Sequence, residues 1–218
     1  MTIRLGIFGY GFIATAHAEG LAHLANGTLR TVCGPNLAKA TAFAQRFNIP
    51  NATIDPHAIV TDPHIDAVII DTPDDAHAPL AILAAEHGKH IFCEKPLATS
   101  LTDAQAMTEA AERAHVRTLV GFSNRWNPTF QHVRQLIAAG VLGHIHHVHA
   151  QSFNASLLGD RPSFTWRTDP QHTGSGILGD LGAHAIDLIH YLLGPITAVC
   201  ASLRTCQPLL YDRQTSLQ

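Results

Sequence analysis

Short apolar segments alternate with helix-like segments through the first half of the chain, and this alternation constrains the fold more than any other feature. The apolar segments cover residues 3–9, 29–33, 66–71, 90–93 and 116–121. Helical spacing of apolar residues fills the intervals at residues 12–24, 37–47, 76–87 and 102–115. Buried strands that alternate with helices of this length are typical of right-handed βαβ units. The sequence therefore predicts an α/β fold with a doubly wound parallel sheet.

The pattern changes after Phe122. We expect helices over residues 128–139 and 181–193, strands over residues 144–154 and 197–204, and an irregular polar stretch over residues 159–176. Two strands cannot bury a sheet face by themselves. Residues 123–218 are therefore predicted to form a partial α+β domain, incomplete as it stands, and we expect the chain to be a fragment or a truncated product.

Composition excludes several classes of function. Apolar residues make up 46% of the 218 residues, as in a globular protein, and the formal net charge is −3. The sequence has no basic block for nucleic acid, no apolar stretch long enough for a membrane span, and no signal-peptide pattern. The cysteines form no C-x-x-C pair, so we expect reduced, buried thiols in a cytoplasmic protein. They are Cys33, Cys93, Cys200 and Cys206.

Four of the 16 histidines cluster in the segment expected to be a strand. Strand alternation would place His147 and His149 on one face, and His144 and His146 on the other. A metal site needs convergent ligands, usually with a carboxylate or thiolate nearby. We therefore favour an exposed strand over a metal site and expect no metal.

A glycine-rich turn joins the first strand to the first helix. In Gly9-Tyr10-Gly11-Phe12-Ile13-Ala14, Gly9 permits the tight turn and Gly11 lets the backbone approach a pyrophosphate. Phe12 and Ile13 begin the helix whose N–H groups face the phosphates, and Ala14 allows close packing on the strand. The alternative is a glycine turn without a ligand. The pattern predicts an NAD(P)-binding domain of the Rossmann type over residues 1–122.

The second strand ends without the acid that usually accepts hydrogen bonds from the ribose of NAD. Gly34 stands at that place, and Asn36 and Lys39 follow it. No carboxylate is present to repel a 2′-phosphate, and Asn36 and Lys39 are suited to bind one. The cofactor is therefore expected to be NADP or NAD, with a slight preference for NADP.

Polar residues at two later places suit hydride-transfer chemistry. Glu94 and Lys95 directly follow a parallel strand, where Lys95 can stabilise charge on a substrate oxygen and Glu94 can hold the lysine or a ribose hydroxyl. A surface ion pair is the alternative. Asp180 and His184 lie four residues apart on one expected helix face, and a histidine is suited to accept an alcohol proton. Asp180 as a helix N-cap and His184 as a packed core residue are the alternatives.

Taken together, these motifs resemble the Gfo/Idh/MocA oxidoreductase family, which includes glucose-fructose oxidoreductase and inositol dehydrogenase. The resemblance runs in order from about Ile3 to Arg204. It rests on the glycine turn, Thr72-Pro73 with His77, Glu94-Lys95-Pro96, Asn124-Arg125-Trp126-Asn127-Pro128, Trp166-Arg167, and the D-x-G-x-H pattern from Asp180 to His184.

The resemblance implies roles for individual residues. Lys95 matches the family lysine, Asp180 the substrate-contacting acid and His184 the catalytic acid/base. Thr72, Pro73 and His77 fall where the family lines the cofactor pocket. The positions where the family meets cofactor or substrate are Arg125, Trp126, Trp166 and Arg167.

The resemblance also implies an activity. Family members use NAD or NADP to oxidise or reduce sugars, inositols and related hydroxy compounds. Two alternatives stay open: an NAD-dependent glycoside hydrolase of the same superfamily, and a non-catalytic dinucleotide-binding regulator. The expected partner is a small-molecule sugar or polyol, and the full-length form is expected to be a homo-oligomer.

Overall fold

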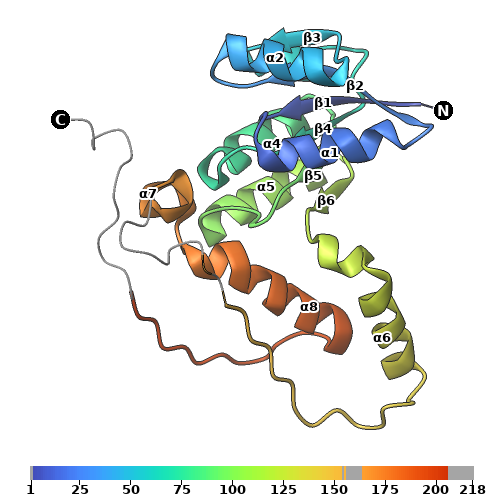
Figure 1. Ribbon diagram of the computed structural model, residues 1–218, viewed down its shortest axis with the longest axis vertical. Coiled ribbons are helices and arrows are strands. Elements are labelled where there is room, and N and C mark those ends of the chain that lie inside the picture. Colours follow the sequence, from blue (N-terminus) through green and yellow to red (C-terminus); the bar gives the residue numbers. More distant parts are fainter. Residues whose placement is uncertain (1, 154, 156–163, 206–218) are drawn as a thin grey trace. The chain divides into compact units, whose positions relative to one another are not determined.

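The computed structural model describes residues 2–153, 155 and 164–205 (Figure 1). The chain divides into two compact units, Met1–Gly121 and Phe122–Gln218. Each unit has its own set of helices, and only the first contains a β-sheet within the described residues.

The first unit is built on a six-stranded sheet in which every neighbouring pair of strands is parallel. The strand order is β3-β2-β1-β4-β5-β6. Their bounds are β1 Ile3–Phe8, β2 Gly27–Cys33, β3 Asn51–Thr53, β4 Ala67–Ile70, β5 His90–Cys93 and β6 Thr118–Val120. The chain runs outwards from β1 to β3 and then returns to β4, so the strand order reverses between β1 and β4. Ligands of open α/β sheets bind at the carboxyl ends of the strands at this reversal.

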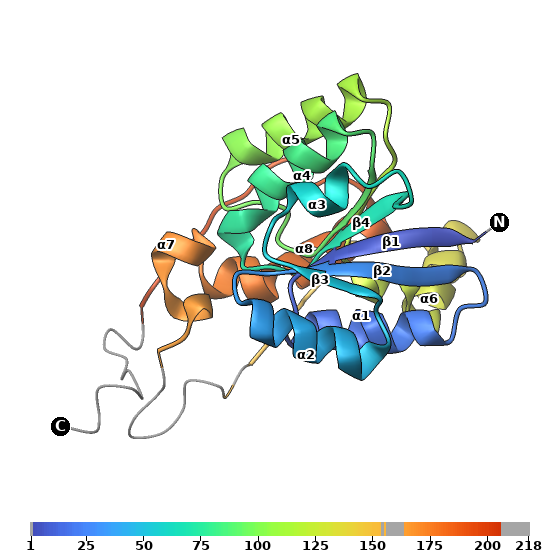
Figure 2. The ribbon, with the colours of Figure 1, turned by 90° about the horizontal axis from the view of Figure 1, so that it is seen from above.

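Helices cover both faces of this sheet, as Figure 2 shows. On one face α1 (Phe12–Ala22) and α2 (Leu37–Phe47) pack through small and aromatic side chains against Ile7, Val32 and Ile69. On the other face lie α3 (His57–Val60), α4 (His77–Glu86) and α5 (Leu101–Arg113), which pack against Phe8, Val68 and Ile70. Successive strand residues point to opposite faces, and this alternation supplies both cores. The predicted doubly wound α/β fold is confirmed.

The register places the ends of neighbouring strands side by side. Phe8 at the end of β1 pairs with Cys33 on one side and with Ile70 on the other, and Ile70 pairs with Cys93. The residues that follow these strand ends therefore lie along one edge of the sheet. They are Gly9, Gly34, Asp71 and Glu94.

Three short elements of the first unit escape sequence analysis. The strand β3, the helix α3 and the 3₁₀ helix η1 (Asp74–Ala76) have three or four residues each, too few to show a period of two or 3.6 residues. The longer predicted elements are found with bounds shifted by a few residues at most, and residues 37–47 and 90–93 match α2 and β5.

The second unit contains helices alone within the residues that are described. They are the 3₁₀ helix η2 (Ser123–Trp126), α6 (Pro128–Ala138), the 3₁₀ helix η3 (Trp166–Thr168), α7 (Pro170–Thr173), the π-helix η4 (Leu178–Gly182) and α8 (Ala183–Leu193). The ring of Tyr191 in α8 lies under the guanidinium of Arg134 in α6, 4.4 Å from its carbon, so these two helices pack together.

The two strands predicted for the second unit are wrong as far as the chain is described. Neither residues 144–153 nor residues 197–204 form a strand, and residue 154 lies outside the described residues. A strand needs a neighbour for its N–H and C=O groups, and no described segment pairs with either stretch. Their apolar side chains stay exposed: Phe153 at 87%, Val199 at 86% and Leu203 at 79%. Most of the predicted polar stretch over residues 159–176 is described, but residues 159–163 are not.

The cysteines follow the prediction only in part. Cys33 and Cys93 are free and buried, and burial raises the pKa of the Cys33 thiol to about 11. Cys200 is free but exposed, so the prediction of burial is wrong there, because its segment has no neighbouring strand to cover it. Cys206 lies outside the described residues. No helix in the described part of the chain has both the length and the apolar character needed to cross a bilayer.

Candidate functional site

The glycine turn after β1 has the geometry that its sequence predicts. Gly9 has a φ of +106°, and a Cβ atom there would lie 2.5 Å from the backbone oxygen of Asp71. Gly11 is the N-cap of α1 and makes no side-chain cap. A Cβ at Gly11 would meet nothing within 4 Å, so the space in front of the helix is open. Ala14 is fully buried against the sheet, Ile13 is half-buried, and Phe12 is 85% exposed.

The carboxyl end of β2 is covered by an aromatic ring. A Cβ atom at Gly34 would lie 2.2 Å from Cε1 of Tyr10, so a larger residue has no room while Tyr10 keeps this position. The Tyr10 hydroxyl accepts a hydrogen bond from the backbone N–H of Asn36. The side chain of Asn36 caps α2 by accepting from the backbone N–H of Lys39 at 3.0 Å. Lys39 is exposed in the first turn of that helix.

His77 connects the loops that follow β4 and β5. Its side chain is completely buried, with Nδ1 2.9 Å from the carbonyl oxygen of Pro96 and Nε2 3.2 Å from that of Thr72. His77 therefore holds two loops together and has no surface left for a cofactor. Thr72 is half-buried and Pro73 is exposed. Within the described residues, the buried Oγ1 of Thr72 has no hydrogen-bond partner.

Glu94 and Lys95 do not form a surface ion pair, because Glu94 is buried. Its Oε2 accepts a hydrogen bond from the backbone N–H of Lys95 at 3.1 Å. Its Oε1 lies so close to the end of β6 that a Cβ at Gly121 would be 2.4 Å from it. Lys95 is half-buried. The carboxylate therefore fixes the backbone that carries the lysine.

Two further polar residues join Glu94, and sequence analysis did not single them out. His17 lies in α1, and Asp71 follows β4 directly below the glycine turn. The Nδ1 atom of His17 is 2.9 Å from Oδ2 and 3.0 Å from Oδ1 of Asp71, and its Nε2 atom is 3.5 Å from Oε1 of Glu94. Among the described residues this trio alone has the spacing that a metal ion would need. The one available signal was the carboxylate of Asp71 at the end of an otherwise apolar strand.

Burial and charge act in opposite directions on these three groups. Burial alone would lower the pKa of His17, but its contacts with Asp71 and Glu94 outweigh burial and raise it. Burial raises the pKa of Asp71 and of Glu94, and the neighbouring His17 offsets part of that rise. One imidazole thus faces two buried carboxylates at the edge of the sheet.

In the second unit, Asp180 and His184 lie on consecutive helical turns. Asp180 lies inside the π-helix η4, whose N-cap is Ile177, so the alternative of Asp180 as an N-cap is wrong. His184 is half-buried in the first turn of α8, and its ring packs edge-on against Phe122 with centroids 6.3 Å apart. A single π-turn within helical structure often accompanies a functional site. Lys95 belongs to the first unit, so its convergence with Asp180 and His184 stays a prediction.

The remaining predicted residues belong to the second unit. The guanidinium of Arg125 binds both carboxylate oxygens of the buried Asp187, with Nε at 2.9 and 3.1 Å. Trp126 is 64% exposed. The guanidinium carbon of Arg167 lies 4.5 Å from the ring centre of Trp166. Arg125 is therefore engaged within the protein, whereas Trp126 offers an open aromatic face.

The predicted histidine patch has a different arrangement from the expected one. Because residues 144–149 form no strand, His147 and His149 do not occupy one face of a sheet. The rings of His144 and His146 are in edge contact, with centroids 4.6 Å apart.

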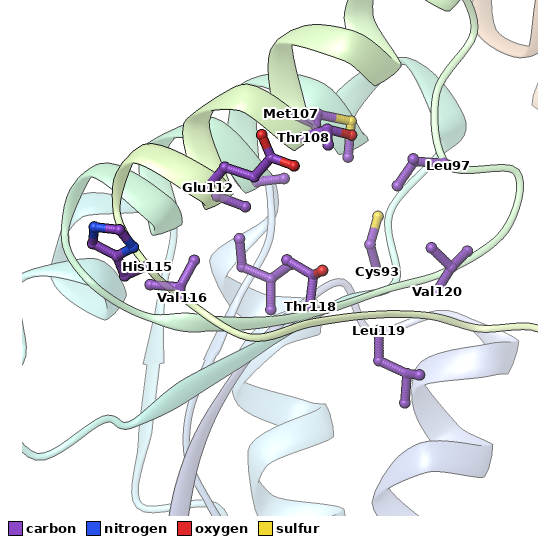
Figure 3. Close-up of a pocket in the computed structure, with 13 residues that line it drawn as sticks. Cys93, Leu97, Met107, Thr108, Glu112, His115, Val116, Thr118, Leu119 and Val120 are labelled. Carbon is purple, nitrogen blue, oxygen red and sulfur yellow. The ribbon is translucent and has the colours of Figure 1, made fainter.

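A separate cavity of about 640 Å³ lies between α5 and the edge strand β6 (Figure 3). Met107, Thr108 and Glu112 of α5 lie on one side, and the Cys93 thiol points towards the helix from β5. None of its lining residues belongs to the glycine turn or to the Glu94-Lys95 pair. The cavity lies beside β6, the last strand on this side of the sheet within the described residues.

A parallel sheet in this order, with a glycine turn at its strand reversal, defines a dinucleotide-binding fold of the Rossmann class. The profile described as an oxidoreductase family with an NAD-binding Rossmann fold, GFO/IDH/MocA, matches residues 3–122. The profile of the GFO/IDH/MocA C-terminal domain matches residues 130–216. The chain belongs to this oxidoreductase family.

Individual relatives agree with this assignment. A levoglucosan dehydrogenase of Pseudarthrobacter phenanthrenivorans is 35% identical, over 94% of this chain and 55% of that protein. A myo-inositol 2-dehydrogenase of Thermotoga maritima is 29% identical, over 88% of this chain and 55% of that protein. The chain thus spans about half the length of the curated relatives that it matches.

Solved structures give the same result. An oxidoreductase domain protein from Kribbella flavida superposes with a TM-score of 0.85 at 34% identity, over 89% of this chain and 55% of that chain. A levoglucosan dehydrogenase in complex with NADH and levoglucosan superposes with a TM-score of 0.81 at 32% identity, over 89% and 55% of the two chains.

Proposed function

We propose that this protein is an NAD(P)-dependent oxidoreductase that transfers a hydride between a nicotinamide cofactor and a hydroxyl-bearing carbon of a sugar, inositol or related polyol. One observation carries the proposal: the glycine turn at Gly9 and Gly11 and the loop bearing Lys95 follow strands at the same edge of the sheet. Relatives named as levoglucosan and inositol dehydrogenases support this substrate class.

The residues at this edge fit a dinucleotide. The open space at Gly11 and the uncapped first turn of α1 leave backbone N–H groups and a positive helix end for phosphate oxygens. Thr72 adds a buried hydroxyl without a partner among the described residues, which suits a polar group of the ligand. When bound, the nicotinamide supplies the hydride acceptor.

The proposed catalytic residues divide the remaining chemistry. The ammonium group of Lys95 holds the substrate oxygen and stabilises negative charge on it. Asp180 accepts a hydrogen bond from the substrate and fixes its orientation. The imidazole of His184 takes the proton of the hydroxyl group as the carbonyl forms.

Three aromatic and basic residues are proposed to contact the substrate, and a fourth to position one of them. The exposed Trp126 presents an apolar face on which a sugar ring can stack. Trp166 is half-buried, and it is proposed to contact the sugar together with Arg167, whose guanidinium lies against the Trp166 ring and adds a charged donor. Arg125 binds Asp187, so its proposed contribution is to position the exposed Trp126 beside it.

The adenosine end is proposed to accept NADP with a slight preference over NAD. Tyr10 occupies the space that a ribose-binding acid at position 34 would need, and the exposed Lys39 supplies a positive charge for a 2′-phosphate. Lys39→Met should weaken NADPH binding about ten-fold and leave NADH binding unchanged, as measured by cofactor fluorescence. An equal loss of affinity for both cofactors would contradict this assignment.

Turnover tests the proposed function. Sugars and polyols are screened with NAD⁺ and NADP⁺ while the absorbance of reduced nicotinamide is followed. For the best substrate, Lys95→Met and His184→Asn should each reduce turnover by about 10²-fold or more. They should leave NADH fluorescence titrations nearly unchanged.

His190→Asn is the matched control, because His190 is exposed in the last turn of the same helix as His184. It should keep the unaltered rate. Normal turnover of the Lys95 or His184 variant would overturn the catalytic assignments. NADH binding without turnover of any compound would overturn the dehydrogenase proposal and favour a dinucleotide-binding regulator.

A further inference from the structure

His17 is the residue at which three separate segments of the first unit meet. It projects from α1, Asp71 follows β4, and Glu94 follows β5. The Asp71 side chain is fully buried, that of Glu94 is 11% exposed, and that of His17 is 24% exposed. The His17 ring also packs edge-on against Phe92, with centroids 4.9 Å apart. The imidazole is thus fixed by packing as well as by charge.

Both ring nitrogens of His17 face carboxylate oxygens. A neutral imidazole carries one N–H donor and one lone pair, and a lone pair repels a carboxylate. With both carboxyl groups ionised, both contacts are favourable only when both nitrogens carry a proton. The short contact to Asp71 is a hydrogen bond, and the 3.5 Å contact to Glu94 is an ion pair.

The contact with Glu94 connects His17 to the lysine loop. Oε1 of Glu94 faces His17 and lies against Gly121, while Oε2 accepts from the backbone N–H of Lys95. A carboxylate without a cation beside it would be drawn out towards water. The Lys95 amide would then lose its acceptor.

We propose that His17 is a positioning residue: as an imidazolium between Asp71 and Glu94, it holds the Glu94 carboxylate on the backbone N–H of Lys95 and so fixes the loop that carries the lysine. This rests on the proposed function only for the catalytic role of Lys95. The arrangement of His17, Asp71 and Glu94 stands without it.

The pH dependence follows from the groups around the imidazole. Asp71 and Glu94 face His17 directly, His77 acts on Asp71, and Lys95 acts on Glu94. Although burial opposes it, the two carboxylates raise the pKa of His17. His17 is therefore fully protonated below the ordinary histidine pKa. It loses this proton only as the pH rises through the raised pKa. Lys95 should be ordered at neutral pH and released at alkaline pH.

A bound divalent cation is the competing interpretation of the same three side chains. It would require an unprotonated imidazole nitrogen directed at the ion, and its binding would release protons. The NMR titration described next separates the two, because a metal would abolish the imidazole titration and EDTA would restore it.

The first experiment measures the protonation of His17 directly. Nitrogen-15 NMR of the histidine rings is recorded from pH 5 to 10 on the wild-type chain and on Asp71→Asn. His17 should titrate above its ordinary range in the wild type and about 1–3 pH units lower in Asp71→Asn. Titration of the wild-type His17 at or below the ordinary value, or no titration until EDTA is added, would overturn the proposal.

The second experiment measures the position of Lys95. In His17→Gln the backbone amide of Lys95 should exchange with solvent at least ten-fold faster, while the amide of Ile7 in the core keeps its rate. His23→Gln is the control, because His23 is exposed at the end of the same helix. Unchanged exchange at Lys95 in His17→Gln would refute the positioning role.

Turnover then connects the network with catalysis. His17→Gln should reduce turnover of the best polyol about ten-fold and remove the alkaline limb of the pH profile, because glutamine does not titrate. An unaltered profile would refute the link between His17 and Lys95. If the wild-type chain turns over no polyol, the proposed function fails, whereas the NMR and exchange results still decide the role of His17.

Discussion

Gly9→Ala tests whether the backbone conformation of the turn requires glycine at position 9. The φ of +106° at Gly9 is unfavourable for any L-residue with a Cβ and costs about 1–3 kcal/mol. The new methyl group would also lie 2.5 Å from the backbone oxygen of Asp71, and overpacking of this kind adds about 1–3 kcal/mol. Some relaxation of β4 will share these costs. We therefore expect Gly9→Ala to lower the free energy of unfolding by about 3 kcal/mol.

Gly11→Ala is the matched control two residues away. Gly11 has a φ of −82° and a ψ of −163°, which alanine adopts readily, and its Cβ would meet no atom within 4 Å. Its stability should therefore change by less than about 1 kcal/mol, the usual scale of an N-cap effect. The methyl group would instead fill the space proposed for a phosphate, so Gly11→Ala should lose NADH affinity while it stays folded.

The assay is urea denaturation followed by far-ultraviolet circular dichroism, with calorimetry for the melting temperature. For a unit of this size, about 3 kcal/mol corresponds to a fall in Tm of roughly 10 °C. The reasoning is refuted if Gly9→Ala is as stable as Gly11→Ala. It is equally refuted if Gly11→Ala is the less stable of the two.

Three further predictions concern contacts outside the turn. Hydrogen bonds from Arg4 lower the pKa of Asp66, so the ion pair stabilises the fold above the ordinary Asp pKa and loses this effect as the pH falls. Arg4→Met should therefore shift acid unfolding to higher pH in a circular dichroism titration. Asn36→Ala removes the cap of α2 and should cost about 1 kcal/mol in urea denaturation. Arg125→Met leaves the buried carboxylate of Asp187 without its cation and should lower the free energy of unfolding by about 2 kcal/mol. The loss is no larger because solvent already screens the partly exposed guanidinium. Asp187→Asn should lower the free energy of unfolding by less in the same urea assay.

The first unit could be predicted because its signals are local. A buried parallel strand has a continuous run of apolar residues, and a helix has apolar residues that recur with a period of 3.6. These patterns locate β1, β4 and α2 without any knowledge of their neighbours. The glycine turn was equally easy to predict, because the positive φ at Gly9 requires glycine, and a glycine at position 11 leaves the space in front of the helix open.

The second unit and the network at His17 could not be read in this way. Apolar residues around Val148 and Val199 show only that a strand would be tolerated, since strand pairing depends on a partner segment that is often far away in the sequence. More than fifty residues separate His17 from Asp71, and more than twenty separate Asp71 from Glu94. Asp71 and Glu94 are marked in the sequence only by their places at strand ends and His17 by nothing local, because the register of β1, β4 and β5 brings the three together.

That register also explains why the glycine turn and the lysine loop should behave as one unit. The backbone of Asp71 lies directly below Gly9, and its side chain holds His17. His17 in turn faces Glu94, whose carboxylate binds the amide of Lys95. A displacement of the β4 end therefore alters the glycine turn and the lysine loop together. Burial makes the connection stiff, because none of the three charged side chains can turn towards water without leaving another buried charge uncompensated.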